Sequence, residues 1–301
     1  MENLGPTIKQ IRLNKGLTQA AVYTGIVSRS FAIRFESGRN DIGAIKLFAI
    51  LDNLAISADE LRFIHDHYQV TPFDQAFLTA DHYYNQQNFP ALTAWIHTHQ
   101  TSAHSYERLV ASYMQIKLLA FDHRQLHLTA AIQPAVQHLQ TTPTWTLHEL
   151  KLANLLVGLT ATENGLAALP PLTEKMVTSC QHYLTPHGDP FNVLQALLEF
   201  YNARLQVELN FHDFDAARAL KPQFMAIKAD QLTWDGRLLQ QTLLGLWELY
   251  FGDVDQGNRI LATITAVEQL YQPFPDTNLR SIIQVRRLEA QAYRLHELKE
   301  N

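Results

Sequence analysis

Residues 17–38 read LTQAAVYTGIVSRSFAIRFESG, and this stretch constrains the fold more than any other part of the chain. Thr18 and Ser28 are residue types that cap helices by accepting a hydrogen bond from an amide of the first turn. Thr24-Gly25 supplies a turn between them, and Gly38 suits the left-handed backbone at which many helices end. The stretch therefore predicts two short helices joined by a tight turn.

Three further short helices are expected around this pair. Leu4, Ile8 and Ile11 recur at helical spacing, and the pattern closes at Lys15-Gly16. A fourth helix is expected from Ile42 to Leu54, and Ser57 with Glu60 has the spacing of a capping box that opens a fifth. Residues 1–68 are thus predicted to form a five-helix domain, in which the helices at 19–23 and 28–36 are the second and third.

The third helix has two different faces. On a helical wheel Ala32 and Phe35 point inward, beside Val27. The side chains on the opposite side are Arg29, Ser30, Ile33 and Arg34. Arginine makes bidentate hydrogen bonds with guanine, serine bonds to bases or phosphates, and an aliphatic side chain can touch a thymine methyl group. These four residues are expected to read base edges if the helix lies in the major groove of DNA.

The charge of the chain is concentrated in the same region. Its net charge is −5, yet residues 1–40 hold six Lys or Arg against two acidic residues. A local basic patch on an acidic protein indicates contact with a polyanion, although a solvated helical face is the simpler alternative. The side chains expected to contact DNA phosphates are Gln19, Arg39, Asn40 and Lys46.

The run GLTQAAVYTGIVSRSFAIRFESGRNDI resembles the helix-turn-helix of the phage-repressor-like (XRE) class. Within it, GI-x-S-x-S-x-x-x-RFE-x-G, followed by an acidic residue and Ile, is similar to the Rgg/MutR type of transcriptional regulator of Gram-positive bacteria. The resemblance covers residues 4–65. It implies a DNA-binding domain followed by a long helical-repeat domain, a homodimer, and control by a short signalling peptide of the quorum-sensing type.

The resemblance also implies a structural pair. Arg12 should bond to Glu36 and so tie the first helix to the third. Where the family usually has a bulky aliphatic residue followed by Ser, this chain has Ala32-Ile33. The operator sequence of the family is therefore not transferred to this chain.

Residues 69–301 repeat a pattern of helix, short polar turn and helix. Thr71-Pro72-Phe73-Asp74 has the composition of a helix start and places the domain boundary between residues 68 and 69. The expected turns are Asn88-Phe89, Asp122-His123, Asn164-Gly165, His212-Asp213 and Gly252-Asp253. Spacings near 40 residues are typical of stacked helix pairs, so the sequence predicts an α-solenoid of divergent tetratricopeptide-like pairs; an irregular helical bundle is the alternative.

A solenoid of this kind has a concave surface that suits an extended peptide. Helix position alone suggests a peptide groove lined by Asn154, Tyr201, Asn202, Arg204 and Trp247. For each of them, ordinary packing within a repeat is the competing interpretation. The last helix, about 276–300, is expected to cap the solenoid or to pack across a dimer axis.

The remaining features argue against an enzyme. The one cysteine, Cys180, excludes an internal disulfide, and His65-Asp66-His67 and His97-Thr98-His99 have a spacing that points helical side chains apart. No phosphate-binding glycine loop or catalytic motif is present, so neither cofactor nor metal is expected. With no apolar leader or membrane span, a cytoplasmic all-α DNA-binding regulator is predicted. A protein-interaction scaffold, and a phage-type repressor or antitoxin, are the alternatives.

Overall fold

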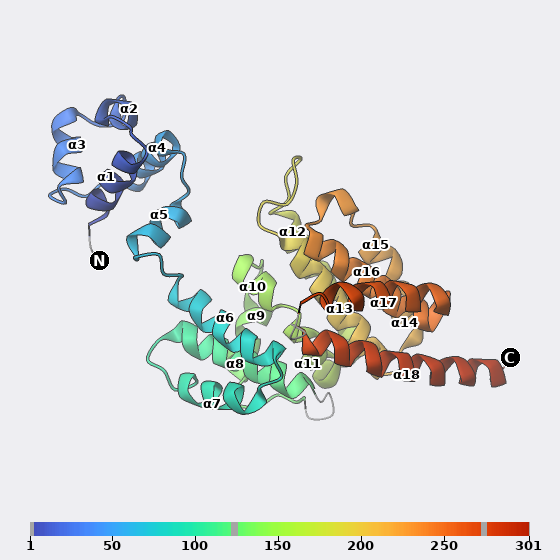
Figure 1. Ribbon diagram of the computed structural model, residues 1–301. Helices are drawn as coiled ribbons and strands as arrows, with labels where there is room; N and C mark the ends of the chain where they lie inside the picture. Colours follow the sequence, from blue (N-terminus) through green and yellow to red (C-terminus); the bar gives the residue numbers. More distant parts are fainter. Residues whose placement is uncertain (1–2, 122–125, 272–275, 301) are drawn as a thin grey trace. The chain divides into compact units, whose positions relative to one another are not determined.

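The computed structural model describes residues 3–121, 126–271 and 276–300, and every regular element assigned in these ranges is a helix (Figure 1). The chain divides into two compact units after Gln75. This division falls in the first turn of a helix, a few residues beyond the boundary predicted at residue 68. Within the described ranges, none of the helices combines the length and the apolar character that crossing a bilayer requires.

The N-terminal unit holds the five predicted helices. They are α1 (Leu4–Asn14), α2 (Gln19–Tyr23), α3 (Arg29–Glu36), α4 (Ala44–Leu54) and α5 (Ala58–His65). Thr18, Ser28 and Ser57 cap α2, α3 and α5 as predicted, each through a side-chain oxygen that accepts an amide hydrogen bond. Helix α4 begins at Ala44 rather than at Ile42, because Gly43 has an extended backbone at the N-cap position.

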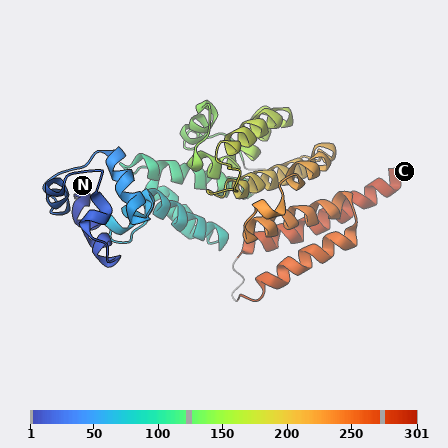
Figure 2. The same cartoon turned by 90° about the horizontal axis from the view of Figure 1, so that it is seen from above.

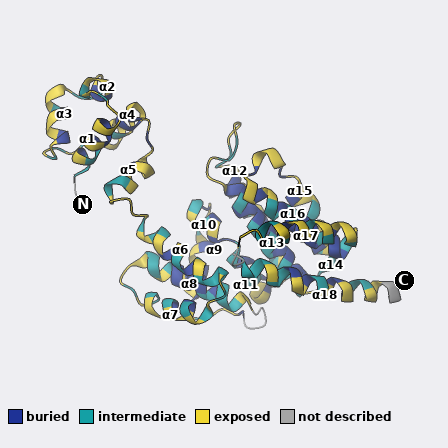
Figure 3. Ribbon diagram, viewed as in Figure 1, coloured by how far each residue is buried: buried dark blue, intermediate teal, exposed yellow. Residues whose placement is uncertain are grey.

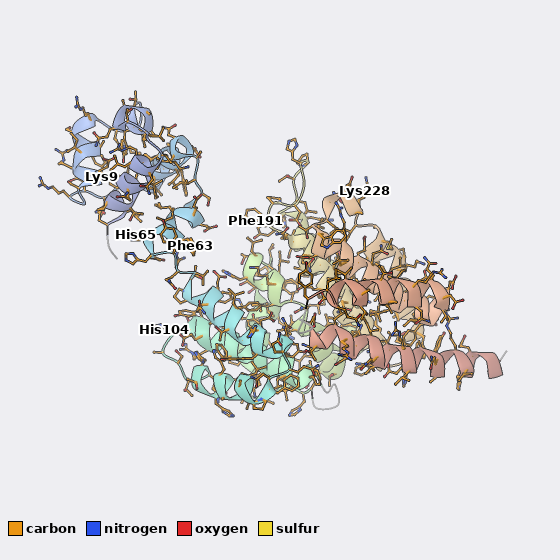
Figure 4. All side chains as sticks on the ribbon, in the orientation of Figure 1. Lys9, Phe63, His65, His104, Phe191 and Lys228 are labelled. Atoms are coloured by element: carbon orange, nitrogen blue, oxygen red, sulfur yellow. The ribbon has the colours of Figure 1, made fainter. Side chains whose placement is uncertain are left out.

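The core of this unit confirms the inward face that was predicted for the third helix. Ala32 and Phe35 are almost completely buried, and Tyr23 meets the Phe35 ring edge-on at 6.5 Å. Gly5 of α1 lies against the end of α3, so close that a Cβ atom there would be 1.7 Å from the Phe35 carbonyl oxygen. The hydroxyl of Thr7 and Nδ1 of His65 (Figure 4) lie 2.9 Å apart and connect α1 to α5.

The C-terminal unit consists of helix pairs. Its helices are α6 (Pro72–Asn85), α7 (Phe89–His99), α8 (Ser105–Phe121), α9 (Gln133–Thr141), α10 (Leu147–Leu152), α11 (Leu155–Asn164), α12 (Leu169–Gln181), α13 (Val193–Asn210), α14 (Phe214–Ala219), α15 (Lys221–Met225), α16 (Trp234–Phe251), α17 (Val254–Glu268) and α18 (Thr277–Glu300). Short 3-10 turns cover Leu166–Ala168 and Ala229–Gln231.

Four of the five predicted turns lie where helices of the C-terminal unit end or meet. They are Asn88-Phe89, Asn164-Gly165, His212-Asp213 and Gly252-Asp253. The predicted turn at Asp122-His123 lies outside the described residues. Asn88, Asp213 and Asp253 also cap the helices that follow them, which is why these turns stop one helix and start the next.

The last three long helices pack side by side, with α16 in contact with both α17 and α18 (Figure 2). Helices α16 and α17 approach closely because two glycines meet at their crossing. A Cβ atom at Gly257 would lie 2.8 Å from the carbonyl oxygen of Gly245. Arg294 of α18 donates to the carbonyl oxygens of Leu249 and Gly252, which are free at the C-terminus of α16.

Candidate DNA-binding face and ligand groove

The outer face of α3 presents the four side chains that were predicted to read DNA bases. Arg29, Ser30, Ile33 and Arg34 are all exposed, and the side of α3 opposite the core is largely solvent-accessible (Figure 3). Ile33 is 50% exposed, so its aliphatic side chain is available for contact. Because Ala32 and Phe35 hold the opposite face in the core, these four side chains project outward from a fixed backbone.

A buried ion pair fixes the end of α3. The guanidinium of Arg12 donates to both carboxylate oxygens of Glu36, at 2.6 and 2.9 Å, and also to the carbonyl oxygen of Leu17 at 2.8 Å. The amide of Gln19 adds a further bond to Glu36 at 2.8 Å. Burial raises the pKa of Glu36, but the hydrogen bonds from Arg12 and Gln19 outweigh it and leave the pKa lowered. The structure thus contains the Arg12–Glu36 pair implied by the resemblance.

The four predicted phosphate contacts differ in their surroundings. Arg39 and Lys46 are exposed. Asn40 is partly buried, and its carbonyl oxygen accepts a bond from Asn3. Gln19 starts α2, but the bond to Glu36 uses one of its amide hydrogens. Gln19 therefore acts first as a brace of the ion pair, a role that the sequence did not indicate, and its side chain has one amide hydrogen left for a phosphate.

A groove of about 430 Å³ lies in the C-terminal unit, where α8, α11, α13 and α18 come together. Its walls are largely apolar. The polar side chains along it include Lys117, Asn154, Gln206, Asn210, Asn278 and Arg286. An apolar groove with a few placed polar groups is the usual form of a ligand-binding site.

Arg286 of α18 organises one wall of the groove. It donates to the side chains of Gln206 and Asn210 on α13, at 2.6 and 2.5 Å, and to Glu289 on its own helix. The hydroxyl of Tyr250 also donates to Glu289, at 3.2 Å. Because these bonds join α13, α16 and α18, the wall is set by side chains from three helices far apart in the sequence.

The opposite end of the groove holds a second polar cluster. The ammonium group of Lys117 lies 4.3 Å from the centre of the Tyr84 ring and bonds to Asp81. Burial, together with the nearby Asp81, raises the pKa of Tyr84 to about 12. Asn278 donates to the carbonyl oxygen of Tyr84, which attaches the start of α18 to α6.

The structure does not bring the five predicted groove residues together. Only Asn154 lines the groove. Tyr201 and Arg204 face α12 instead and line a separate shallow depression with Thr173. Trp247 donates to the carbonyl oxygen of Arg218 and does not line the groove.

The physical reason is the orientation of α13. The guanidinium of Arg204 pairs with Glu208 one turn further on, and its other nitrogen donates to Thr173 at 2.9 Å, so both charges are buried. The groove side of α13 carries the next residues around the helix, Gln206 and Asn210. Asn202 lies one turn before Gln206 and accepts its amide at 3.2 Å, beside the groove rather than in it.

Sequence reasoning missed Gln206, Asn210 and Arg286. One signal was available: Asn202, Gln206 and Asn210 recur every four residues, which places three amides on one face of the helix. No pattern indicated Arg286, because its partners come from α13. In the part of the chain that the structure describes, no three His, Cys, Asp or Glu side chains are grouped to hold a metal ion; His104, for instance, stacks on Tyr106.

Comparison with known proteins agrees with this geometry. The family profile described as helix-turn-helix matches residues 8–61, which span most of α1 to α5. Among curated proteins, none is significantly similar in sequence.

Several solved structures have the same fold over nearly the whole chain. A putative transcriptional regulator from Listeria monocytogenes EGD-e is 19% identical, with 97% of this chain and 99% of that chain covered and a TM-score of 0.69. The Streptococcus dysgalactiae SHP pheromone receptor Rgg2 is 18% identical, with 97% and 99% covered and a TM-score of 0.66. The PrgX/cCF10 complex is 16% identical, with 97% and 94% covered and a TM-score of 0.61. The chain therefore carries an XRE-type helix-turn-helix domain, and nearly all of it has the fold of the Rgg2 and PrgX structures.

Proposed function

We propose that this protein is a sequence-specific DNA-binding transcriptional regulator, controlled by a short peptide that binds in the groove of its C-terminal unit. The outward face of α3 carries the first part of the proposal: Arg29, Ser30, Ile33 and Arg34 are exposed together on a helix whose other face is buried. Arg39, Asn40, Lys46 and the remaining amide hydrogen of Gln19 are proposed to contact phosphates. We propose a cytoplasmic location, because that is where the DNA of the proposed target lies.

The test of DNA binding starts with selection of duplexes from a random pool by the full-length protein. Arg34→Ala or Arg29→Ala should relax the preference at one base position and weaken the selected duplex by about 1–3 kcal/mol. Arg39→Ala should weaken all duplexes alike and reduce the salt dependence of binding. Lys9→Ala is the control, because Lys9 is an exposed basic residue of α1 outside the proposed interface (Figure 4).

Two outcomes count against this assignment. A base preference unchanged by both Arg29→Ala and Arg34→Ala would remove the readout role from α3. The absence of any salt-sensitive duplex binding would favour the scaffold alternative, in which the C-terminal unit binds a protein partner.

The groove supports the second part of the proposal. Four helices form its walls. The side-chain amides of its Asn and Gln residues offer donors and acceptors that can pair with a peptide backbone. The solved structures with this fold include the SHP pheromone receptor Rgg2 and a bacterial peptide pheromone/receptor complex, which supports a peptide as the ligand of the groove. Asn154 and Asn210 are the proposed backbone contacts.

The peptide is to be found by selection from a displayed library of random decapeptides on the full-length protein. Ala203→Trp, which fills the groove, should abolish binding of the selected peptides, and Asn210→Ala should weaken it. The matched control is Thr178→Ala, in the depression that contains Tyr201 and Arg204. If Thr178→Ala weakens binding of the selected peptides and Ala203→Trp does not, the peptide site lies in that depression and not in the groove.

A further inference from the structure

The α13 wall of the groove carries three amide side chains, here called the amide row. Asn202, Gln206 and Asn210 recur every four residues and so follow one line along the helix. All three are partly buried, and Gln206 and Asn210 line the groove itself. The hydrogen bonds of the row determine which of its atoms face a ligand.

Arg286 fixes the orientation of two of these amides. Its guanidinium donates from Nε to Oε1 of Gln206 at 2.6 Å, and from Nη2 to Oδ1 of Asn210 at 2.5 Å. A guanidinium has five N–H donors and no acceptor, so only the oxygen of an amide can face it. The amide nitrogens of Gln206 and Asn210 therefore point away from Arg286.

The same orientation continues to Asn202. The amide nitrogen of Gln206 donates to Oδ1 of Asn202 at 3.2 Å, which leaves the amide nitrogen of Asn202 at the end of the row. In the part of the chain that the structure describes, neither Nδ2 of Asn202 nor Nδ2 of Asn210 donates a hydrogen bond. Each oxygen of the row is thus engaged by a donor, and the groups that remain free are N–H donors.

The charges around the row favour a neutral acceptor. Arg286 also donates to Glu289 at 2.5 Å, so its positive charge is compensated within the wall. A carboxylate of a ligand would be repelled by Glu289, which lines the same groove. The carbonyl oxygens of a peptide backbone have no net charge and accept N–H hydrogen bonds.

The spacing of the row suits an extended chain. Residues four apart in an α-helix are separated by about 6 Å along its axis. In an extended peptide, the carbonyl groups of every second residue point to the same side, at intervals of about 6.8 Å. Each amide of the row can therefore meet one carbonyl group, because side chains of this length take up the small difference.

We propose that Arg286 is a positioning residue, which turns the amide row into a wall of donors that bind the carbonyl groups of alternate residues of an extended peptide. This role of Arg286 rests on the peptide ligand of the proposed function. The wall selects for carbonyl oxygens and against ligands that present N–H donors or carboxylates to α13.

Replacement of Asn210 by aspartate tests the direction of its amide. Asn210→Asp keeps the oxygen that faces Arg286 and replaces the outward nitrogen with a second oxygen. The variant should bind the selected decapeptides more than about tenfold more weakly, because two acceptors then face each other. Gln284→Glu is the matched control: it makes the same chemical change at an exposed position of α18 outside the groove, and should bind as the wild type does.

Asn210→Leu separates the lost hydrogen bond from the added charge. This variant has no donor and no charge at position 210, and it should weaken peptide binding about three- to tenfold. Wild-type affinity in either Asn210→Leu or Asn210→Asp would overturn the donor role of the amide row.

Thioamide peptides identify the acceptor and test Arg286. A thioamide replaces one carbonyl oxygen with sulfur, which is a weaker acceptor. At the residue that meets Asn210, this change should weaken binding to the wild type about threefold or more, and should have no effect on Asn210→Leu. Arg286→Met frees the amide to turn and should also remove the effect, whereas Arg286→Lys, which is likewise only a donor, should retain part of it.

The contrary outcomes are distinct. A purely structural Arg286 would lower the affinity of Arg286→Met but leave the thioamide effect intact, which would overturn its positioning role. If Arg286→Met does not fold, Arg286→Lys and the two Asn210 variants decide. A library that yields no peptide would contradict the proposed function and the donor wall together. Peptides whose binding is abolished by Ala203→Trp but unaffected by Asn210→Asp would contradict the donor wall alone.

Discussion

At the scale of single residues, the N-terminal unit depends on one buried pair of charges. Arg12 and Glu36 are both nearly inaccessible to solvent, and each has lost its hydration. The pair is tolerated because the two carboxylate oxygens receive three donors and Arg12 also bonds to the carbonyl oxygen of Leu17. A buried pair of this kind adds little net stability, but removing one partner leaves the other charge uncompensated.

Glu36→Ala should therefore destabilise the N-terminal unit by about 3–5 kcal/mol. The double variant Arg12→Met/Glu36→Leu should cost much less, because it leaves no stranded charge. Hydrogen exchange of the full-length protein, followed across residues 3–71, measures both effects. Equal protection losses in the single and double variants would show that the pair is not coupled.

Acid should weaken the same unit. The pKa of Glu36 is lowered in the folded protein, from about 4.3 in an unfolded chain. The stabilisation is therefore complete above about pH 4.3 and is lost as the pH falls through the folded-state pKa of Glu36. Thermal unfolding of Glu36→Gln should show a weaker pH dependence below about pH 4.3 than the wild type, whereas Glu60→Gln, at an exposed acid of α5, should follow the wild type.

At the scale of elements, glycines make a close contact between α16 and α17 in the C-terminal unit. Gly257 of α17 lies against the backbone of α16, where a Cβ atom would be 2.8 Å from the carbonyl oxygen of Gly245 and 3.0 Å from the amide of Leu249. A side chain at this crossing must displace backbone rather than a flexible side chain. The packing of α16 on α17 thus requires the absence of a Cβ atom.

Gly257→Leu should force α16 and α17 apart and destabilise the C-terminal unit by about 1–3 kcal/mol or more. The neighbouring Gln256→Leu is the matched control, because Gln256 is exposed on the same helix. Chemical denaturation of both variants gives the comparison. A Gly257→Leu protein as stable as Gln256→Leu would mean that the helices separate without cost.

At the scale of the whole molecule, the chain consists of two units with their own cores. The N-terminal core is built on Ile8, Phe35 and Leu54, and every buried member of that cluster lies between residues 8 and 61. The groove is likewise formed only by residues of the C-terminal unit. Each unit should therefore unfold as its own cooperative transition.

Calorimetry of the full-length protein should resolve two transitions. Glu36→Ala should lower the temperature of one of them and leave the other unchanged, and Gly257→Leu should do the reverse. A single transition that both substitutions shift equally would show that the two units unfold together.

The local elements of the N-terminal unit could be predicted from sequence. Thr18, Ser28 and Ser57 cap helices because their side chains reach amides only a few residues away. The orientation of the Ala32 and Phe35 side chains toward the core follows from the helical period alone. The Arg12–Glu36 pair was implied by the resemblance to a known family. These features depend on short-range geometry or on a recurring motif.

The groove was decided by tertiary structure. Whether Arg204 meets a ligand or is buried depends on Glu208 and Thr173, and Thr173 belongs to another helix. The wall made by Arg286 exists because α18 returns to α13 after some 80 residues of chain. By itself the sequence determined an all-α chain with a helix-turn-helix near its N-terminus, because helix formation, capping and amphipathicity act within a few turns. Only the fold decided which faces of α13 and α18 enclose a cavity, because that choice is made by contacts between helices distant in sequence.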